Sequence, residues 1–183
     1  RGISIFDIIR YRIGYAESGP YSGKIIIPSY DSEGQLNYFV SRAFYEHDSY
    51  KHKNPKVSKD IIGFDMLINW NEPITLCEGA FDAITIKRNA IPLFGKQINP
   101  KLRIKIIEEG VKEIYICLDQ DAIKNAKHIA KTFMTEGITV HLVKLDKDDP
   151  NELGYKKITE KIHDTYQFSF EELMQMEIDS LWK

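Results

Sequence analysis

The sequence lacks the features that would take it into or across a membrane. No apolar run approaches the roughly 18 residues that a membrane-spanning helix needs, and the longest runs, such as residues 25–27, have the length of a strand. The start of the chain does not resemble a signal peptide. We therefore expect a cytoplasmic protein with no membrane association. Because the first residue is Arg1, we also expect that the chain belongs to a longer protein.

Cysteine is scarce, since Cys77 and Cys117 are the only two in the chain. A zinc site made of four cysteines is thereby excluded. Each cysteine lies within an apolar run of strand length. We expect both to be small, buried core residues.

A strong net charge is also lacking, because the formal charge is only −2. This value argues against nucleic-acid binding through overall charge alone. The charges are, however, unevenly distributed: basic side chains outnumber acidic ones between residues 42 and 59, and acidic ones are in slight excess from residue 71 onward. A basic region beside an acidic one suits an enzyme that holds a polyanion and also binds a metal.

The first part of the chain has the pattern of a small α+β subdomain. Its 72 residues precede a change of pattern near Pro73, and the two strands that we expect in it would pair as an antiparallel β-hairpin. The expected elements are a short helix over residues 4–12 with Ser4 as N-cap, a turn-rich stretch over 14–23, a strand over 24–28 closed by Pro28, a turn over 31–34, a strand over 36–44 and an irregular polar segment over 46–60.

After Pro73, short apolar runs alternate with helical patterns. Such alternation predicts an α/β fold with a mainly parallel sheet and flanking crossover helices. We therefore expect three parts: an N-terminal subdomain over residues 1–72, an α/β domain over 73–165, and a C-terminal helix or linker over 166–183. The expected strands cover residues 74–77, 91–94, 113–118 and 138–144, and the expected helices 80–88, 99–109, 122–136, 151–163 and 170–182.

Acidic residues follow three of these strands. Glu78 and Asp82 come after the first, Asp119 and Asp121 after a later one, and Asp149 after the last. In an open α/β sheet, ligands bind at the carboxyl ends of the strands. Carboxylates that are forced together repel one another, and a divalent cation with a preference for oxygen ligands, Mg²⁺ or Mn²⁺, relieves that repulsion. The set predicts a site for one or more such ions acting on phosphate.

Each acidic segment on its own has an ordinary structural explanation. A glutamate at a strand end is most often solvated, Asp121 could cap a helix, and Asp149 before Pro150 could form a turn. The metal-site interpretation depends on all three segments falling at the appropriate ends of predicted strands.

These segments resemble the signature of the Toprim domain, which is shared by DnaG-type primases, topoisomerases and several nucleases. The resemblance to DnaG-type primases extends upstream, over the predicted hairpin with Ser41 and Arg42, and over the segment 51–55. It implies a Toprim-like mainly parallel sheet and covers residues 11–153. The signature segments are Glu78-Gly79-Ala80-Phe81-Asp82, Asp119-Gln120-Asp121 and Asp149-Pro150-Asn151-Glu152-Leu153.

The resemblance also implies roles for individual residues. Glu78 matches a metal ligand or acid–base residue, and Asp82 the second acid of the same motif. Asp119 and Asp121 match a metal-binding pair, and Asp149 the acid of the third motif. The sequence departs from the family pattern at three places: Asn151 stands where many members have a second Asp, Gln120 where Gly is frequent, and Ile123-Lys124 where an Ala-Gly pair is common.

Basic residues between the two predicted halves form a candidate nucleic-acid contact. Arg42 and Lys51 match family residues that contact nucleotide phosphates or template, and Lys53 and Lys56 lie close by in the sequence. Aromatic residues are interleaved with them, an arrangement that suits single-stranded DNA. A solvated lysine-rich loop is the alternative. Lys96, after another predicted strand, is equally consistent with a phosphate contact and with a surface position.

The function that we expect is that of a DNA primase catalytic core, which joins ribonucleoside triphosphates on a single-stranded DNA template by metal-dependent nucleotidyl transfer. A replicative helicase is the expected protein partner, and a short, bacteriophage-type primase is one version of this hypothesis. Two alternatives stay open: a Toprim nuclease with the same acids, and a non-catalytic module that binds single-stranded DNA. A topoisomerase is disfavoured, because the chain is short for the additional domains that it needs.

Overall fold

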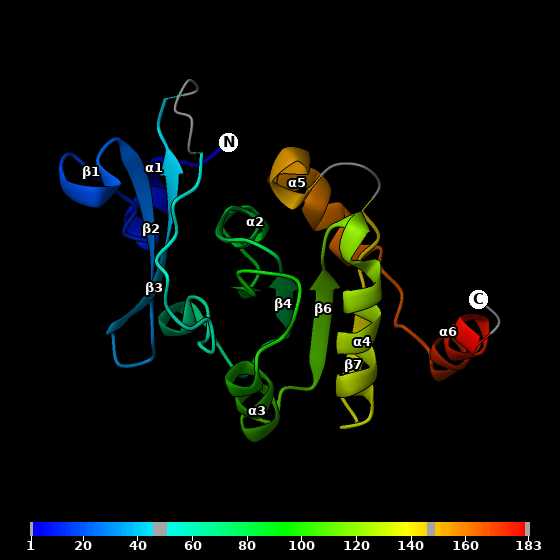
Figure 1. Cartoon of the computed structure of the whole chain (residues 1–183). Coiled ribbons are helices and arrows are strands. Elements are labelled where there is room, and N and C mark those ends of the chain that lie inside the picture. Colours follow the sequence, from blue (N-terminus) through cyan, green and yellow to red (C-terminus); the bar gives the residue numbers. More distant parts are fainter. Residues whose placement is uncertain (1, 46–50, 146–148, 182–183) are drawn as a thin grey trace.

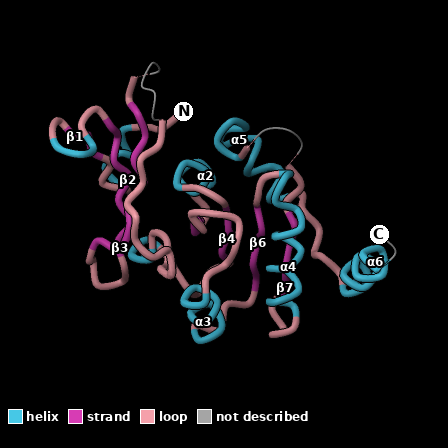
Figure 2. Tube along the Cα trace, in the orientation of Figure 1, coloured by secondary structure: helices cyan, strands magenta, loops and turns pink. Residues whose placement is uncertain are grey.

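The computed structural model describes residues 2–45, 51–145 and 149–181. Part of the predicted irregular segment, residues 46–50, lies outside the described residues. The described chain forms a small antiparallel sheet at its N-terminal end and a larger parallel sheet with flanking helices (Figures 1 and 2). This is the α/β architecture that the sequence predicts, including the preceding α+β subdomain.

The first helix, α1 (Ile5–Arg10), has Ser4 as its N-cap, as the sequence predicts. The Asp7 amide donates to the Ser4 hydroxyl at 3.3 Å, and the Ser4 amide donates to the Asp7 carboxylate at 2.9 Å. This reciprocal capping box satisfies amides that have no partner inside the helix. Asp7 also forms an ion pair with Lys87 at 2.9 Å, which ties α1 to the larger domain.

The antiparallel sheet has three strands rather than the two of the predicted hairpin. β2 (Lys24–Tyr30) pairs with β3 (Leu36–Ala43), and β1 (Gly14–Ala16) pairs with the start of β2. The stretch that was expected to be only turns therefore contains a short strand, and the 3-10 turn η1 (Gly19–Tyr21) follows it.

The prediction that Pro28 closes its strand was wrong, because β2 continues through Pro28 to Tyr30. β1 pairs only with residues 24–26, so β2 has no neighbouring strand on that side at Pro28. A residue without an amide hydrogen is tolerated at such an edge position. The turn that follows is held by Asp31, whose carboxylate accepts from the amides of Glu33 and Gln35 at 3.1 and 2.8 Å.

The segment from residue 51 to Pro73 connects the two sheets. It first runs beside β3, where the Ala43 amide donates to the carbonyl of Lys51 at 2.9 Å. It then passes the edge of the parallel sheet and forms the short turn η2 (Asp65–Leu67). At Gly63 the passage is so close that a β-carbon would lie 2.4 Å from the carbonyl oxygen of Pro92.

The larger sheet is parallel throughout, in the order β5-β4-β6-β7. Helices alternate with the strands, as the sequence predicts, and the final helix α6 (Phe170–Leu181) follows this unit. The elements are β4 (Ile74–Cys77), α2 (Ala80–Ile86), β5 (Ala90–Pro92), α3 (Pro100–Glu108), β6 (Glu113–Cys117), the turn η3 (Gln120–Ala122), α4 (Ile123–Met134), β7 (Thr139–Leu142) and α5 (Pro150–His163).

Helix α3 illustrates how local signals set these boundaries. The Leu102 amide donates to the Asn99 side chain at 2.8 Å, and Pro100 occupies the first turn, where its missing amide hydrogen costs nothing. Gly110 follows the helix with a φ of 64°, a backbone conformation that favours glycine.

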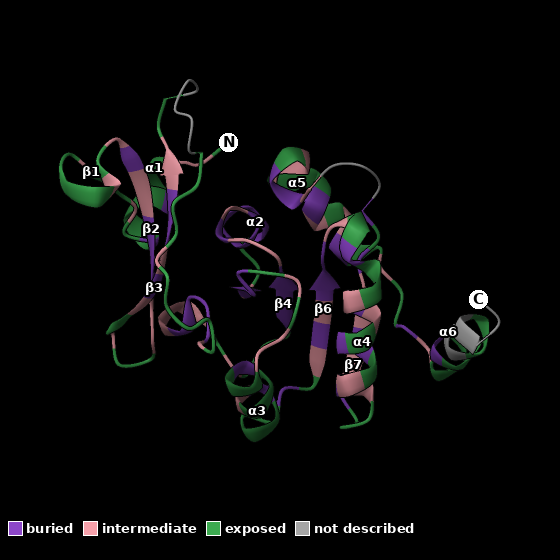
Figure 3. Ribbon diagram, in the orientation of Figure 1, coloured by how far each residue is buried: buried purple, intermediate pink, exposed green. Residues whose placement is uncertain are grey.

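Two hydrophobic clusters cover the two faces of the parallel sheet. One packs α3 and α4 against the sheet, with Leu102, Ile129 and Phe133 fully or almost fully buried. The other packs α2 and α5 on the opposite face and continues into the antiparallel sheet through Tyr38 and Phe64. Figure 3 shows the central strands buried between these layers. Among the described residues, no helix combines the length and the apolar character needed to cross a membrane.

Gly63 offers a test of the contact between the connecting segment and the parallel sheet. We expect Gly63→Ala to lower the free energy of unfolding by about 1–3 kcal/mol, because the added methyl group would overlap the Pro92 backbone. Gly14→Ala is the matched control, since a β-carbon there would have no atom within 4 Å. Urea unfolding of both variants measures the effect, and equal stability of the two would contradict this packing.

Candidate active site

The register of two neighbouring strands brings the first acids together. β4 and β6 pair in parallel with Cys77 opposite Cys117, so the residues that follow them leave the sheet at the same edge. The chain passes from β4 to β5 on one side and then returns to β6 on the other. Such a reversal of strand order is the place where open α/β sheets bind ligands.

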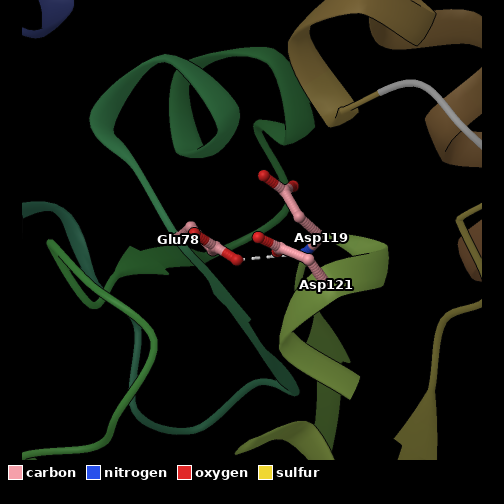
Figure 4. A group of neighbouring side chains, drawn as sticks. All are labelled: Glu78, Asp119 and Asp121. Carbon is pink, nitrogen blue, oxygen red and sulfur yellow. Dashed lines mark hydrogen bonds between the residues drawn. The ribbon is translucent and has the colours of Figure 1, made fainter.

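Glu78, Asp119 and Asp121 form a compact acidic cluster at this edge (Figure 4). One carboxylate oxygen from each lies within 4.8 Å of the others. The Asp119 amide donates to a Glu78 carboxylate oxygen at 3.3 Å, and the turn η3 carries Asp121 to the same place. The structure thus brings together three of the five acids that the sequence singles out, from segments about forty residues apart.

The cluster is electrostatically unfavourable by itself. Burial raises the pKa of Glu78, and repulsion from Asp119 adds to the effect. Burial likewise raises the pKa of Asp119, followed by repulsion from Asp149 and Asp121. Lys96 acts in the opposite direction on both, since its ammonium lies 2.5 Å from an Asp121 carboxylate oxygen.

The donor set fits a hard divalent cation. All three groups offer carboxylate oxygen, which Mg²⁺ and Mn²⁺ prefer. Moreover, the Asp119 Oδ1 atom is buried and has no hydrogen-bond partner among the described residues. A buried oxygen without a donor is costly, and a cation between the three carboxylates would satisfy it.

Asp82 lies behind this cluster, at the start of α2. It accepts from the Gly79 amide at 2.9 Å and from the backbone amide of Asn151. Burial, and then repulsion from Asp149 and Asp119, raises the pKa of Asp82 to about 7. Asp82 therefore belongs to the same electrostatic group, although its oxygens are not part of the three-residue cluster.

Two residues of the third acidic segment have structural contacts at the start of α5. The Asp149 carboxylate accepts from the Glu152 amide at 2.7 Å and so caps the helix. The Asn151 side chain donates to the Thr85 hydroxyl at 2.8 Å, which fixes α5 against α2. The position at which the resembled family often carries a second Asp thus holds a buried amide that joins two helices.

The two cysteines lie directly beneath the acids. Both are fully buried and free, as expected from the sequence. Burial raises the pKa of each thiol, and nearby carboxylates raise it further. The thiols are therefore neutral parts of the site's floor.

Of the four predicted basic contacts, Arg42 lies on β3, and Lys51 and Lys53 hydrogen-bond to β3 through their backbone. The Arg42 guanidinium contacts the His52 ring, and the Lys53 ammonium donates to the Pro20 carbonyl at 2.6 Å. Lys51 and Lys56 are exposed. The role of these four side chains in binding nucleic acid stays a prediction.

An exposed group of aromatic rings lies at the end of β3. Phe44 packs edge-on against Tyr15 and Tyr45, with ring centroids 5.8 and 5.0 Å apart. All three rings are about half exposed. Phe44 and Tyr45 follow Arg42 closely in the sequence, among the interleaved aromatic residues, whereas Tyr15 comes from β1 and is brought there by strand pairing.

Two further lysines connect the basic segment with the acids. The Lys59 ammonium donates to the Phe94 carbonyl at 2.6 Å, two residues before Lys96. The Asn99 side chain donates to the carbonyls of Lys59 and Ile61 at 3.0 and 2.7 Å. The loop that carries Lys96 is thus held by the connecting segment. The only sequence signal for Lys96 was its position after Gly95 at a predicted strand end.

Comparisons with known proteins agree with this arrangement. Residues 75–154 match the family model described as Toprim-like. A curated relative, the uncharacterized protein MG010 of Mycoplasma genitalium, is 27% identical over 151 residues, which are 74% of this chain and 66% of the relative.

Solved primase structures have the same fold. The Aquifex aeolicus primase, with its zinc-binding and RNA polymerase domains, superposes with a TM-score of 0.76 at 20% identity, covering 98% of this chain and 57% of that one. The E. coli primase catalytic core gives a TM-score of 0.76 at 15% identity, covering 98% of this chain and 74% of that one. The primase fragment of the bacteriophage T7 primase-helicase gives a TM-score of 0.68 at 19% identity, covering 88% of this chain and 70% of that one.

The fold is therefore that of DnaG primase catalytic cores, with a Toprim-like segment at its centre. The chain spans a little less than two thirds of the length of its curated relative and 57% of the Aquifex primase chain. These structural similarities concern the fold, which places the acidic cluster at the edge of the parallel sheet.

The raised pKa of Asp82 predicts how stability depends on pH when no metal is bound. An unfolded aspartate titrates near 3.8, whereas folded Asp82 keeps its proton up to about 7. Because the unfolded chain binds fewer protons in this window, the free energy of unfolding should fall as the pH rises through it, by up to a few kcal/mol.

Urea unfolding between pH 4 and 8 with a chelator measures this slope. We expect a smaller slope for Asp82→Asn than for the unmodified protein. A slope of Asp82→Asn equal to that of the unmodified protein would contradict the environment described for Asp82.

Proposed function

We propose that this chain is the catalytic core of a DNA primase, which joins ribonucleotides into short RNA primers on a single-stranded DNA template by metal-dependent nucleotidyl transfer. One observation carries the proposal: Glu78, Asp119 and Asp121 converge at the strand-order reversal of a fold shared with primase cores. The basic and aromatic residues on and after β3 support it, because a polymerase must also hold a template and a triphosphate.

In this proposal the acids hold the metal. Glu78, Asp119 and Asp121 bind Mg²⁺ or Mn²⁺ directly, and Asp82 and Asp149 complete the set that can hold one or two ions. When bound, such an ion lowers the pKa of the attacking 3′-hydroxyl and neutralises charge on the leaving pyrophosphate. Glu78, whose pKa is raised by burial, is also suited to accept or relay a proton.

The basic residues hold the substrates. Arg42 and Lys51 contact the triphosphate or the template, and Lys53 and Lys56 contact the template backbone. The exposed ring of Phe44 and its aromatic neighbours lie beside this segment and can stack with bases, a contact worth about 1–3 kcal/mol per base.

The domain division and the partners belong to the same proposal. Residues 1–72 are the proposed subdomain that holds template and nucleotide, residues 73–165 the proposed Toprim-like metal-binding domain, and residues 166–183 a C-terminal helix or linker that includes α6. A replicative helicase is the proposed protein partner, in the cytoplasm of a bacterial cell.

Removal of one cluster acid tests the catalytic proposal. We expect Asp119→Asn and Asp121→Asn each to reduce primer synthesis by more than about 100-fold, because each removes a charged metal ligand. The measurement is the yield of labelled oligoribonucleotides on single-stranded DNA with Mg²⁺ or Mn²⁺. Asp164→Asn is the matched control, and circular dichroism shows whether each variant is folded.

The same assay separates the alternatives. A folded Asp119→Asn variant that still primes would sink the catalytic assignment. Metal-dependent degradation of the template without added nucleotides would indicate a nuclease with the same acids. DNA binding that is unchanged by a chelator, without any reaction, would indicate a non-catalytic binding module.

The basic segment is tested by the salt dependence of binding. We expect Lys51→Ala and Lys56→Ala each to weaken binding to single-stranded DNA and to lower the slope of log K against log salt by about 0.7, the loss of one phosphate contact. Lys112→Ala, an exposed lysine before β6, is the control. Fluorescence anisotropy with a labelled oligonucleotide gives both values, and slopes equal to the control would exclude the phosphate contacts.

A further inference from the structure

Lys96 occupies an unusual position between the acidic cluster and a polar groove. It lies in the loop after β5, and its ammonium reaches across to the turn after β6, 2.5 Å from an Asp121 carboxylate oxygen. The two residues are 25 positions apart in the sequence. A positive charge of this chain therefore already touches the group of carboxylates that a divalent cation would need.

The ammonium affects more than its direct partner. It lowers the pKa of both Glu78 and Asp119, against the effects of burial and carboxylate repulsion. Lys96 thus offsets part of the repulsion within the cluster, as a bound cation would. A divalent cation that enters the cluster would repel this ammonium, so both cannot hold Asp121 favourably at the same time.

A nearby groove offers Lys96 another place. A cavity of about 330 Å³ between the loop that precedes α3 and helix α4 is lined by Lys96 itself and by Gln97, Lys124, Asn125 and His128. A second cavity of about 380 Å³, between α3 and α4, shares His128 and adds Arg103, whose guanidinium is paired with Glu136 at 3.3 Å. Among the described residues that line these two cavities, none is acidic, so the groove is suited to an anion.

We propose that Lys96 is an exchangeable counter-ion: it pairs with Asp121 while no divalent cation is bound, and when one binds it turns into the α3–α4 groove and contacts a phosphate group. The proposal rests on the proposed function in one respect, namely that the acidic cluster binds a divalent cation. The phosphate belongs either to a nucleoside triphosphate or to a nucleic-acid backbone, since both present the same charged oxygens.

This exchange couples two binding events. The cation must displace Lys96 from Asp121. This displacement weakens the binding of the cation when no phosphate is present. Once released, the ammonium is available to phosphate, so each ligand strengthens the binding of the other by the same factor. Lys96 is in this sense a positioning residue that links the metal to the substrate.

Calorimetric titration of the whole chain tests the exchange without any catalytic readout. With Mn²⁺ alone, we expect Lys96→Met to bind the ion about three- to thirty-fold more tightly than the unmodified protein, because the competing charge is gone. We expect Lys96→Arg to restore the weaker binding. Lys124→Met, which removes a groove charge without an ion pair to Asp121, should leave the affinity for Mn²⁺ nearly unchanged and so controls for general charge effects.

The second part of the experiment measures coupling. In the unmodified protein, saturating Mn²⁺ should strengthen the binding of ATP or of a short oligothymidylate beyond its effect on Lys96→Met. Enhancement confined to ATP identifies the phosphate as that of a triphosphate, and enhancement confined to the oligonucleotide identifies it as a backbone phosphate. Enhancement of both supports a general phosphate contact.

The possible failures are distinguishable. If the unmodified protein binds no Mn²⁺, the metal site of the proposed function fails and the exchange fails with it. If the unmodified protein binds Mn²⁺ and Asp119→Asn abolishes this binding, but Lys96→Met binds the ion no more tightly, only the exchange is overturned. Coupling of equal size in Lys96→Met and in the unmodified protein overturns it as well.

Discussion

The parallel pairing of β4 with β6 is the constraint on which the site depends. With Cys77 opposite Cys117, the next residues of both strands leave the sheet together, and Glu78 and Asp119 are held close whether or not their charges favour it. Sheet hydrogen bonds and the buried strands around them supply the free energy for this arrangement. The backbone amide of Asp119 and the ammonium of Lys96 both act to reduce its electrostatic cost.

The antiparallel sheet is joined to this site through packing rather than through charge. Tyr38 and Phe64 share a hydrophobic cluster with Phe94 and with α2, with ring centroids of Tyr38 and Phe94 only 4.7 Å apart. Phe94 directly precedes the loop that carries Lys96. A displacement of the small sheet would therefore move this loop, and the half that is proposed to hold nucleic acid is mechanically linked to the half that holds the acids.

The sequence predicts most of the fold because its boundaries depend on local chemistry. Asn99 with Pro100 starts a helix and Gly110 ends it without help from distant residues. Pro28 was misjudged because its tolerance depends on which strand lies beside it, and the strand β1 was missed because it exists only through pairing with β2. At the site, the acids that follow the strands could be predicted from the sequence. The contact of Lys96 with Asp121 could not, because it depends on how two loops meet across the sheet.

The neutral cysteines affect which metal ions the proposed site would bind. Sulfur lies one and two residues before Glu78 and Asp119, and a thiolate there would attract soft metals such as zinc and copper. Burial instead keeps both thiols protonated, and the Cys77 thiol is directed to the carbonyls of Gly79 and Ile91, each 3.7 Å away. Among the described residues of the acidic cluster, the candidate ligand atoms are all carboxylate oxygens, so in the proposed metal site the protonated thiols beneath them would not favour a soft ion.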